Sequence, residues 1–191
     1  LGFNTLKYNS VAAQMSRGKS EKTVAFAMSS VAATLAKFSM DVCLYMSQNF
    51  DFISLPAHLT TGSSIMPHKK NPDVFELIRG KCNKIQALPY EITLITNNLP
   101  SGYHRDFQLL KEGLFPAIQN LKACLDIAIF SIKDIKVKDN ILVDKKYDYL
   151  FTVDTLNEMV VAGMPFRDAY KAVAEQLENG TFQSPKETKH T

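Results

Sequence analysis

The chain has 191 residues, 46% apolar and 21% charged, which excludes a disordered chain and fits one globular domain or slightly more. Its net charge of +3 is too small and too evenly spread to indicate a nucleic-acid-binding protein. The cysteines, Cys43, Cys82 and Cys124, have neither metal-ligand spacing nor the even count of a disulfide framework. We therefore expect buried apolar thiols in a reducing compartment, the cytoplasm, and no metal site.

The first residues, 1–19, lack clear periodicity and are expected to be mostly loop. From Ser20, a suitable N-cap, to residue 49 the chain has no Gly or Pro, which predicts a helix about 45 Å long. Lys37 is the only charge between residues 23 and 40, so the composition fits either a membrane span or a helix buried among other helices. The alanines, serines and threonines distributed around this segment favour the buried helix, and we expect no membrane association.

A second long helix is expected to begin at Asn71-Pro72-Asp73, where Asn71 caps the helix, Pro72 takes its first position and Asp73 complements its dipole. Apolar residues then recur at three-four spacing over about 25 residues, and Pro89 among them predicts a kink. Residues 99–102 break the pattern. The expected apolar stripe consists of Phe75, Ile78, Cys82, Ile85, Ile92 and Ile95.

A third long helix is expected from about residue 104 to 132, again kinked, by Pro116. Residues 133–149 are more charged and leave room for one small helix. The expected stripe of the third helix consists of Leu109, Leu110, Leu114, Ile118, Leu121, Leu125 and Ile129.

The last part of the chain predicts two further helices, one over 154–162 that Gly163 ends and one that Pro165 opens. The polar tail from Gly180 is expected to be mobile. Because no segment alternates as a strand would, the predicted fold is all-α. We expect a long-helix bundle in residues 1–143 and a small C-terminal helical domain in residues 144–191.

The stretch 60–73, TTGSSIMPHKKNPD, connects two long helices and ends at a helix N-terminus. Lys69, Lys70 and the N–H groups of that terminus make an anion site, and Gly62 allows a ligand to approach the backbone closely. The hydroxyl of Ser63 becomes a base only if cations and N–H groups stabilise its alkoxide, and this stretch supplies both. The alternative is a flexible loop with solvated lysines, although such a long connection between helices is uncommon unless it is functional or disordered.

The run 62–72, followed by Glu76, resembles the signature of the fumarase/aspartase superfamily of lyases. Residues 99–103 with Asp106, Gln108 and Lys111 resemble the substrate-binding segment of one branch, the argininosuccinate lyase family. With residues 1–3, 9–10, 163–169 and Arg17, the resemblance covers nearly the whole chain. It implies a homotetramer built around a long helical bundle, an elimination that releases fumarate, and no cofactor.

The resemblance implies catalytic roles for three residues of the signature region. Ser63 would be the base that removes a proton from the carbon beside a carboxylate of argininosuccinate, and Lys69 would stabilise the doubly charged aci-carboxylate intermediate. Glu76 would orient a histidine general acid, although the residue alone also fits an exposed first-turn carboxylate. Cleavage of the C–N bond would then release arginine and fumarate, a step of arginine biosynthesis.

The resemblance also implies a set of substrate-binding residues. Spacing places Gln108 and Lys111 on one helix face with Tyr103 in the preceding turn, although an ordinary polar helix start has the same composition. Arg17 is a weaker match, because Ala12 and Gly18 stand where many members have acids, and the role of His68 stays open. The set implied for substrate binding is Asn71, Tyr103, Gln108, Lys111 and Arg17.

Part of the family's catalytic machinery has no counterpart in this sequence. The family's general-acid histidine and its neighbouring threonine belong to a segment upstream of residue 1, and the family assembles each active site from three subunits. We therefore expect a C-terminal fragment that is inactive when isolated and exposes apolar stripes to water. The alternatives are another fumarate-releasing lyase (adenylosuccinate lyase or aspartase), a crystallin-like structural homologue, or a helical binding module whose loop holds an anion.

Overall fold

The computed structural model describes residues 2–66 and 68–185 and divides into two units, Leu1–Val137 and Lys138–Thr191. The sequence-based boundary was placed a few residues later, between 143 and 144. The end of the tail that was expected to be mobile lies outside the described residues.

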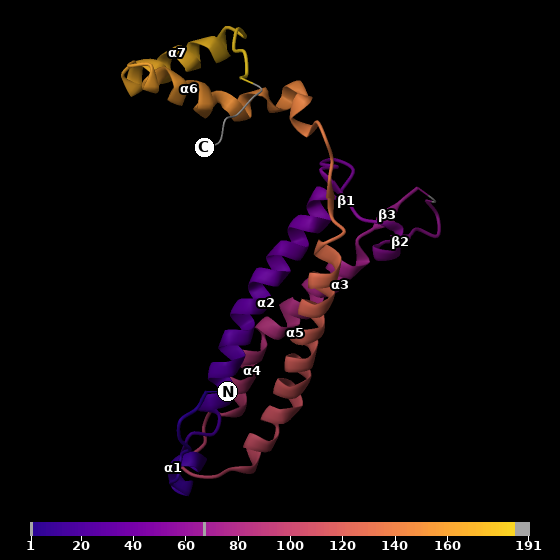
Figure 1. The fold of residues 1–191 in the computed structure, drawn as a ribbon. Coiled ribbons are helices and arrows are strands. Elements are labelled where there is room, and N and C mark those ends of the chain that lie inside the picture. The colour runs from indigo at the N-terminus through magenta and orange to yellow at the C-terminus, as the bar shows by residue number, and fades with distance from the viewer. Residues whose placement is uncertain (1, 67, 186–191) are drawn as a thin grey trace. The chain divides into compact units, whose positions relative to one another are not determined.

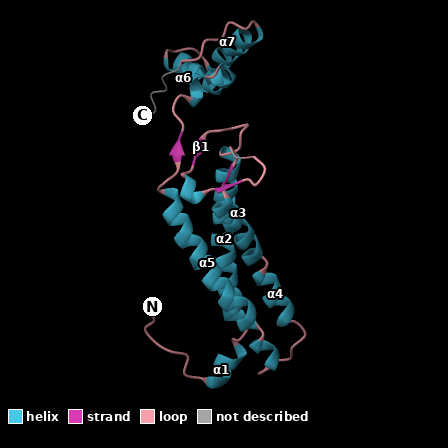
Figure 2. Cartoon of the chain, turned by 90° about the vertical axis from the view of Figure 1, so that its right-hand side faces the viewer, coloured by secondary structure: helices cyan, strands magenta, loops and turns pink. Residues whose placement is uncertain are grey.

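The first unit is a bundle of long helices, as Figures 1 and 2 show. After the short α1 (Ser10–Met15), α2 (Lys19–Tyr45) packs along α3 (Asp73–Gln86) and α4 (Leu88–Ile95). The third long helix, α5 (Leu110–Ile132), follows a 3-10 helix at Arg105–Gln108 and packs against α2, α3 and α4. The three expected helical regions of the bundle are therefore confirmed, with corrections at their ends.

Two of these corrections concern helix boundaries. The N-cap residue of α2 is Gly18, with φ of 80°, and not Ser20. The second long helix is not one kinked helix: Ala87 ends α3 and precedes α4, and Pro89 lies in the first turn of α4. A proline at that position loses no helical hydrogen bond, because the first N–H groups of a helix have no partner within it.

The core of the bundle is formed by one buried stripe from each helix, and small residues in these stripes let the helices approach closely. In α5 the expected stripe is largely confirmed: Leu110, Leu114 and Leu121 are buried, and Ile118 and Leu125 pack partly buried against the core. Of the expected members, Leu109 and Ile129 are exposed. The expected stripe was incomplete, because small side chains of α5, Ala117, Cys124 and Ala128, are also buried. The buried set is Ala25, Met28, Ala32, Leu35, Ala36, Val42, Leu55, Leu59, Phe75, Ile78, Cys82, Ile85, Leu88, Ile92, Phe107, Leu110, Leu114, Ala117, Leu121, Cys124 and Ala128.

The cysteines are free thiols, with Cys82 and Cys124 buried and Cys43 half-buried. Burial, together with the neighbouring Cys124, raises the pKa of Cys82 to about 12. Cys82 is therefore a protonated, unreactive thiol at neutral pH, as expected from the sequence.

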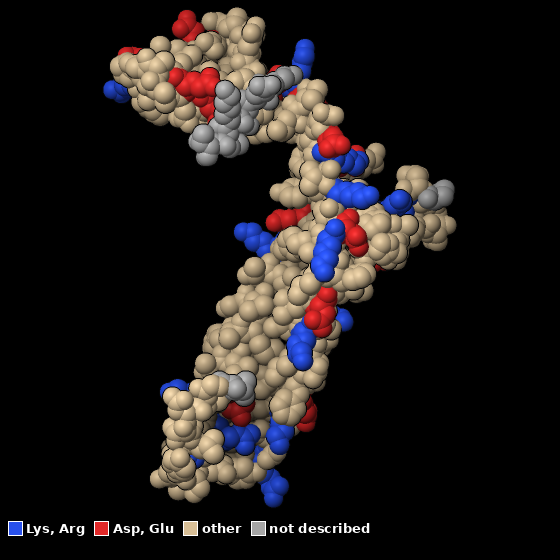
Figure 3. Space-filling model, in the orientation of Figure 1, with Lys and Arg blue, Asp and Glu red and all other residues tan. Residues whose placement is uncertain are grey.

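Among the described residues, two helical segments, Lys19–Tyr45 and Arg105–Ile132, are long and apolar enough to cross a membrane by length and composition. Both pack into the bundle through their buried stripes, which fits the expected bundle helices. Their outer faces still expose apolar side chains, including Phe26 on α2 and Phe115 and Phe130 on α5. Figure 3 shows the corresponding uncharged surface along α2.

Four two-residue strands complete the first unit, although no strand was expected. β1 (Ile53–Ser54) pairs antiparallel with β4 (Lys136–Val137), and β2 (Thr61–Gly62) pairs antiparallel with β3 (Lys70–Asn71). A 3-10 helix at Ala57–Leu59 separates β1 from β2. Strands of two residues are too short to show any alternation in the sequence.

The second unit is a helical hairpin. Two 3-10 helices, Ile141–Val143 and Lys145–Phe151, lead into α6 (Thr152–Val161) and α7 (Phe166–Glu178). Leu156, Ala169 and Val173 form its buried centre. The turn contains Gly163 with φ of 100°, and Pro165 precedes α7, as the sequence predicted.

Candidate active site

The signature loop leaves and re-enters the bundle through a narrow neck. Thr61 pairs with Asn71 and Gly62 with Lys70, so the neck is a two-pair antiparallel ladder. Figure 1 shows the loop projecting beyond this ladder at the end of the bundle where α3 begins. The tip is exposed to solvent, with Ile65 87% exposed.

Ser63 is held in a tight turn directly after the neck. Its Oγ accepts hydrogen bonds from the backbone N–H groups of Ile65, at 3.2 Å, and Met66, at 3.1 Å. Two N–H donors aimed at one oxygen favour its ionised form over its neutral form. The sequence analysis expected such N–H groups from the helix N-terminus that follows the loop, whereas the donors in the structure belong to the loop itself.

Several other signature residues line a cavity of about 630 Å³ between the loop and the end of α2. Lys69, Asn71 and Glu76 contribute to its wall, together with His68, and Ser63 does not. The walls carry both cationic and acidic side chains, which suits a ligand with charges of both signs. His68 thus belongs to the cavity lining, a placement that the sequence left open.

The local roles of Asn71 and Glu76 need comment. The expected role of Asn71 as a helix cap is wrong, and Glu76 still fits two interpretations. Asn71 is not the helix cap: it lies in β3, and the N-cap of α3 is Pro72, with no side-chain cap hydrogen bond. Glu76 lies in the first turn of α3 and is exposed, where a carboxylate complements the helix dipole whether or not it also acts in catalysis.

Tyr103, Gln108 and Lys111 are joined by hydrogen bonds between their side chains. Gln108 Nε2 donates to the Tyr103 hydroxyl at 2.9 Å, and Lys111 Nζ donates to Gln108 Oε1 at 3.2 Å. The structure therefore brings together the three residues that the sequence grouped. Gln108 belongs to the 3-10 helix and Lys111 to α5, so they share a turn rather than one continuous helix face.

Arg17 lies close to this cluster but has protein partners of its own. Its Nε lies 2.9 Å from Glu21 Oε1, its Nη2 donates to the Phe107 carbonyl at 3.2 Å, and its guanidinium lies 5.7 Å from the centre of the Phe107 ring. It also lines a cavity of about 370 Å³ with Lys19 and Lys22. Arg17 thus fastens the start of α2 to the segment that carries Gln108.

Glu21 was not found by sequence reasoning. Its Oε2 accepts a hydrogen bond from the Gly18 N–H at 2.8 Å, which is the glutamate half of a capping box at the start of α2. Burial alone would raise the pKa of Glu21, but backbone hydrogen bonds at Glu21 and Gly18 and the bond from Arg17 outweigh it and lower that pKa. The spacing of Gly18 and Glu21 was the available signal, since a capping box joins residues three apart.

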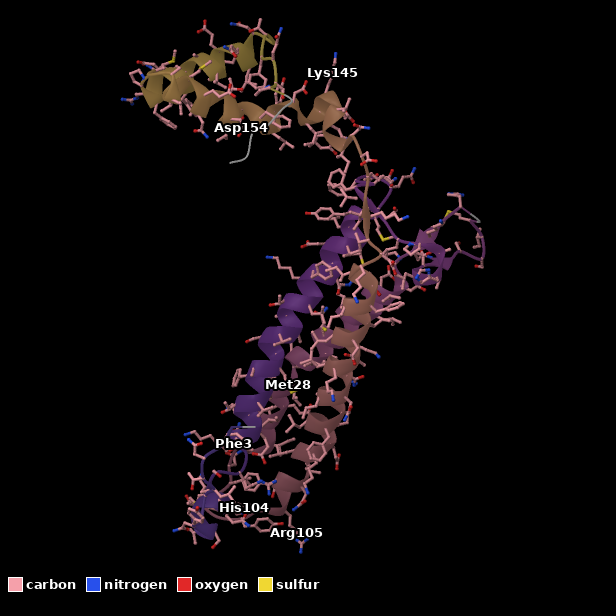
Figure 4. All side chains as sticks on the ribbon, viewed as in Figure 1. Phe3, Met28, His104, Arg105, Lys145 and Asp154 are labelled. Atoms are coloured by element: carbon pink, nitrogen blue, oxygen red, sulfur yellow. The ribbon has the colours of Figure 1, made fainter. Side chains whose placement is uncertain are left out.

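The residues of the signature loop and the cluster of Tyr103, Gln108 and Lys111 lie at opposite ends of the bundle; these are the two clusters of the candidate site. α2 runs from one to the other, and its 27 residues span about 40 Å. In Figure 4 the labels His104 and Arg105 mark the end that carries Tyr103 and Gln108, and the signature loop lies at the other end. One chain therefore cannot bring Ser63 and Lys111 to the same small substrate.

Among the described residues, no group of three or more His, Cys, Asp or Glu side chains is arranged to hold a metal ion.

Comparison with curated proteins gives argininosuccinate lyases as relatives. That of Parabacteroides distasonis is 58% identical and that of Bacteroides thetaiotaomicron 54% identical, each over all 191 residues of this chain and 43% of the relative. That of Stenotrophomonas maltophilia is 38% identical over 174 residues, 91% of this chain and 40% of the relative. The chain thus spans less than half the length of these relatives. Residues 2–87 also match a protein family described as lyase.

Solved structures share the fold at low sequence identity. An EDDS lyase variant with bound fumarate superposes with a TM-score of 0.69 at 20% identity, covering 94% of this chain and 37% of that chain. A class II fumarase from Schistosoma mansoni gives a TM-score of 0.70 at 19% identity, covering 94% and 39%. The chain therefore shares its fold with these solved lyase structures, and over its full length it is similar to argininosuccinate lyases.

Proposed function

We propose that the chain is part of an argininosuccinate lyase, a carbon–nitrogen lyase that reversibly eliminates fumarate from argininosuccinate to give arginine. The observation that carries this proposal is the Ser63 hydroxyl, held by two backbone N–H groups inside the signature loop. The reaction serves arginine biosynthesis. We place the protein in the cytoplasm and assign it no cofactor, no nucleic acid and no membrane partner.

The catalytic step assigned to the loop is proton abstraction. Ser63, as the alkoxide, removes the proton beside a carboxylate of the substrate, and the N–H groups of Ile65 and Met66 stabilise that alkoxide beforehand. Lys69, at the far side of the loop, then stabilises the aci-carboxylate as its charge grows. Glu76 orients a general acid that another part of the protein supplies, and collapse of the intermediate releases arginine.

Substrate recognition is assigned to the cluster at the other end of the bundle. Lys111, Gln108 and Tyr103 present a cation and polar groups in one hydrogen-bonded row, which suits the carboxylate and amino groups of an amino acid. Arg17 supports this row through the Phe107 carbonyl, and Asn71 contributes from the signature loop.

We further propose a homotetramer whose active sites are shared between subunits. The separation of the two clusters by the length of α2 supports this proposal, because sites that combine ends from different chains would bring both clusters to one substrate. The exposed apolar side chains on α2 and α5 are the surface that such association would remove from water. The isolated 191-residue chain is accordingly expected to be inactive.

The test is the absorbance of fumarate formed from argininosuccinate by the complete gene product. Ser63→Ala should lose about a thousandfold in kcat, in line with removal of a general base. Ser30→Ala, an exposed serine on α2, is the matched control and should retain activity. A Ser63→Ala tetramer that keeps wild-type turnover would leave the loop only a binding role.

The same assay with adenylosuccinate and aspartate separates the alternative lyases. No fumarate from any of these substrates, with a folded wild-type tetramer, would overturn the proposed activity and favour a structural, crystallin-like role.

A further inference from the structure

A side-chain hydrogen bond closes the neck of the signature loop. Thr61 Oγ1 donates to Asp73 Oδ2, and the two residues are twelve positions apart. Thr61 begins β2, and Asp73 is the first residue of α3. The bond therefore joins the outgoing arm of the loop to the helix that follows the returning arm.

This bond lies at the base of the neck, beside the Thr61–Asn71 pair of the ladder. Leu59, 4% exposed, anchors the outgoing arm in the core, and Phe75, with no exposed surface, anchors the returning arm. Among the described residues, the two arms are joined between these anchors and the tip by the two-pair ladder and the bond from Thr61 to Asp73. A ladder of two pairs is marginal by itself, so a side-chain bond across it changes how firmly the arms are held.

The neck controls the spacing between the two catalytic residues proposed above. Ser63 directly follows β2, and Lys69 directly precedes β3. If the arms separate, the Ser63 hydroxyl and the Lys69 ammonium separate with them. Proton abstraction and charge stabilisation must act on one substrate at the same time, and small misplacements of such groups are costly in rate.

We propose that Thr61 and Asp73 are positioning residues, whose hydrogen bond holds the neck closed so that Ser63 and Lys69 act on the same substrate. The inference rests on the proposed function of the loop. It differs from the interpretation of Asp73 as a simple first-turn acid, because a helix-dipole role of Asp73 would not depend on the hydroxyl of Thr61.

The test uses the complete gene product with Thr61→Val, which keeps the shape of the side chain and removes its hydroxyl. The expected result is a loss of about tenfold in kcat, with KM changed less than about twofold, since the bond acts on catalytic geometry and not on ground-state binding. Thr61→Ser, which restores a hydroxyl, should return kcat to within about twofold of wild type.

Thr60→Val is the matched control, because Thr60 Oγ1 donates to carbonyls of its own turn, Ala57 among them, and does not cross the neck. It should keep the wild-type kcat. The double variant Thr61→Val/Asp73→Asn should be no slower than the slower single variant, because the two residues act through one bond. Wild-type kcat in Thr61→Val, an equal loss in Thr60→Val, or no recovery in Thr61→Ser would each overturn the inference.

Amide hydrogen exchange provides a readout that is independent of activity. Exchange in residues 62–66 and 68–70 should be about fivefold faster in Thr61→Val than in wild type or Thr60→Val, as expected when a local closing interaction is lost. If the wild type forms no fumarate, the proposed function fails, and exchange still decides whether the clamp exists. Equal exchange in all three proteins would overturn the clamp.

Discussion

Arg17 and Glu21 form an ion pair of 2.9 Å across the first turn of α2, and Glu21 uses its second oxygen to cap that helix at the Gly18 N–H. Because Arg17 also binds the Phe107 carbonyl, one carboxylate organises the junction between the start of α2 and the segment before α5. The junction lies beside the Tyr103–Gln108–Lys111 row, so its integrity matters for the substrate end of the bundle.

This junction should weaken in acid. The folded-state pKa of Glu21 is lowered, so its stabilising contribution is complete above its ordinary pKa of 4.5 and is lost as the pH falls through the lower folded-state value. At neutral pH, wild type should be more stable than Glu21→Gln by about 0.5–1 kcal/mol, a magnitude that allows for solvent screening. Urea unfolding of both proteins at a series of pH values measures the difference. A difference that stays constant in acid would contradict the role assigned to the ionised carboxylate.

Ser39 and Ser131 are both fully buried, and replacing each with alanine should change the free energy of unfolding differently. Ser39 Oγ donates to the Leu35 carbonyl at 2.8 Å, whereas Ser131 Oγ has no hydrogen-bond partner among the described residues. Ser131→Ala should therefore raise the free energy of unfolding by about 1 kcal/mol, since it removes an unpaired buried hydroxyl. Ser39→Ala should leave it unchanged or lower it. Thermal unfolding of the two variants side by side measures the contrast, and an equal effect of both would be inconsistent with it.

The long helices could be predicted because their sequences exclude other structures. The segment from Ser20 to residue 49 contains no Gly or Pro, and the apolar residues that begin at Phe75 recur at helical spacing. The division at Ala87 could not be predicted, because a proline reads as a kink or as a helix start depending on which N–H groups already lack partners. The β1–β4 ladder joins Ser54 to Lys136, a pairing across the chain that local patterns do not contain.

The sequence proposes residues for the candidate site but does not give the geometry of that site. The resemblance of the signature proposes Ser63 and Lys69 by residue type and order, and the resemblance of residues 99–111 proposes Tyr103, Gln108 and Lys111. Their placement at opposite ends of α2 depends on how the helices reverse direction, which sequence patterns do not specify. The two-residue neck and the bond from Thr61 to Asp73 likewise depend on the path of the loop.

The hydrogen-bonded row of Tyr103, Gln108 and Lys111 should determine the KM for argininosuccinate. Gln108 is the central member, since it donates to Tyr103 and accepts from Lys111. Gln108→Leu breaks both bonds and should raise KM for argininosuccinate about tenfold, with a smaller effect on kcat. Gln119→Leu, at an exposed position of α5 outside the row, is the control and should leave KM unchanged. Steady-state kinetics of the complete gene product measure both constants, and an unchanged KM in Gln108→Leu would remove the row from substrate binding.

The separation of the two clusters predicts complementation between inactive variants. Ser63→Ala lacks the base and Lys111→Met lacks the cation at the other end, so tetramers of either variant alone should be inactive. If each site draws these residues from different subunits, tetramers reassembled from an equal mixture should have about a quarter of their sites intact, because each of two independent positions is wild type half of the time.

Fumarate formation after joint denaturation and refolding measures this recovery, and each variant refolded alone is the control. Native mass spectrometry identifies mixed tetramers. If tetramers mix and no activity returns, each site takes Ser63 and Lys111 from one subunit, and the shared-site arrangement is wrong.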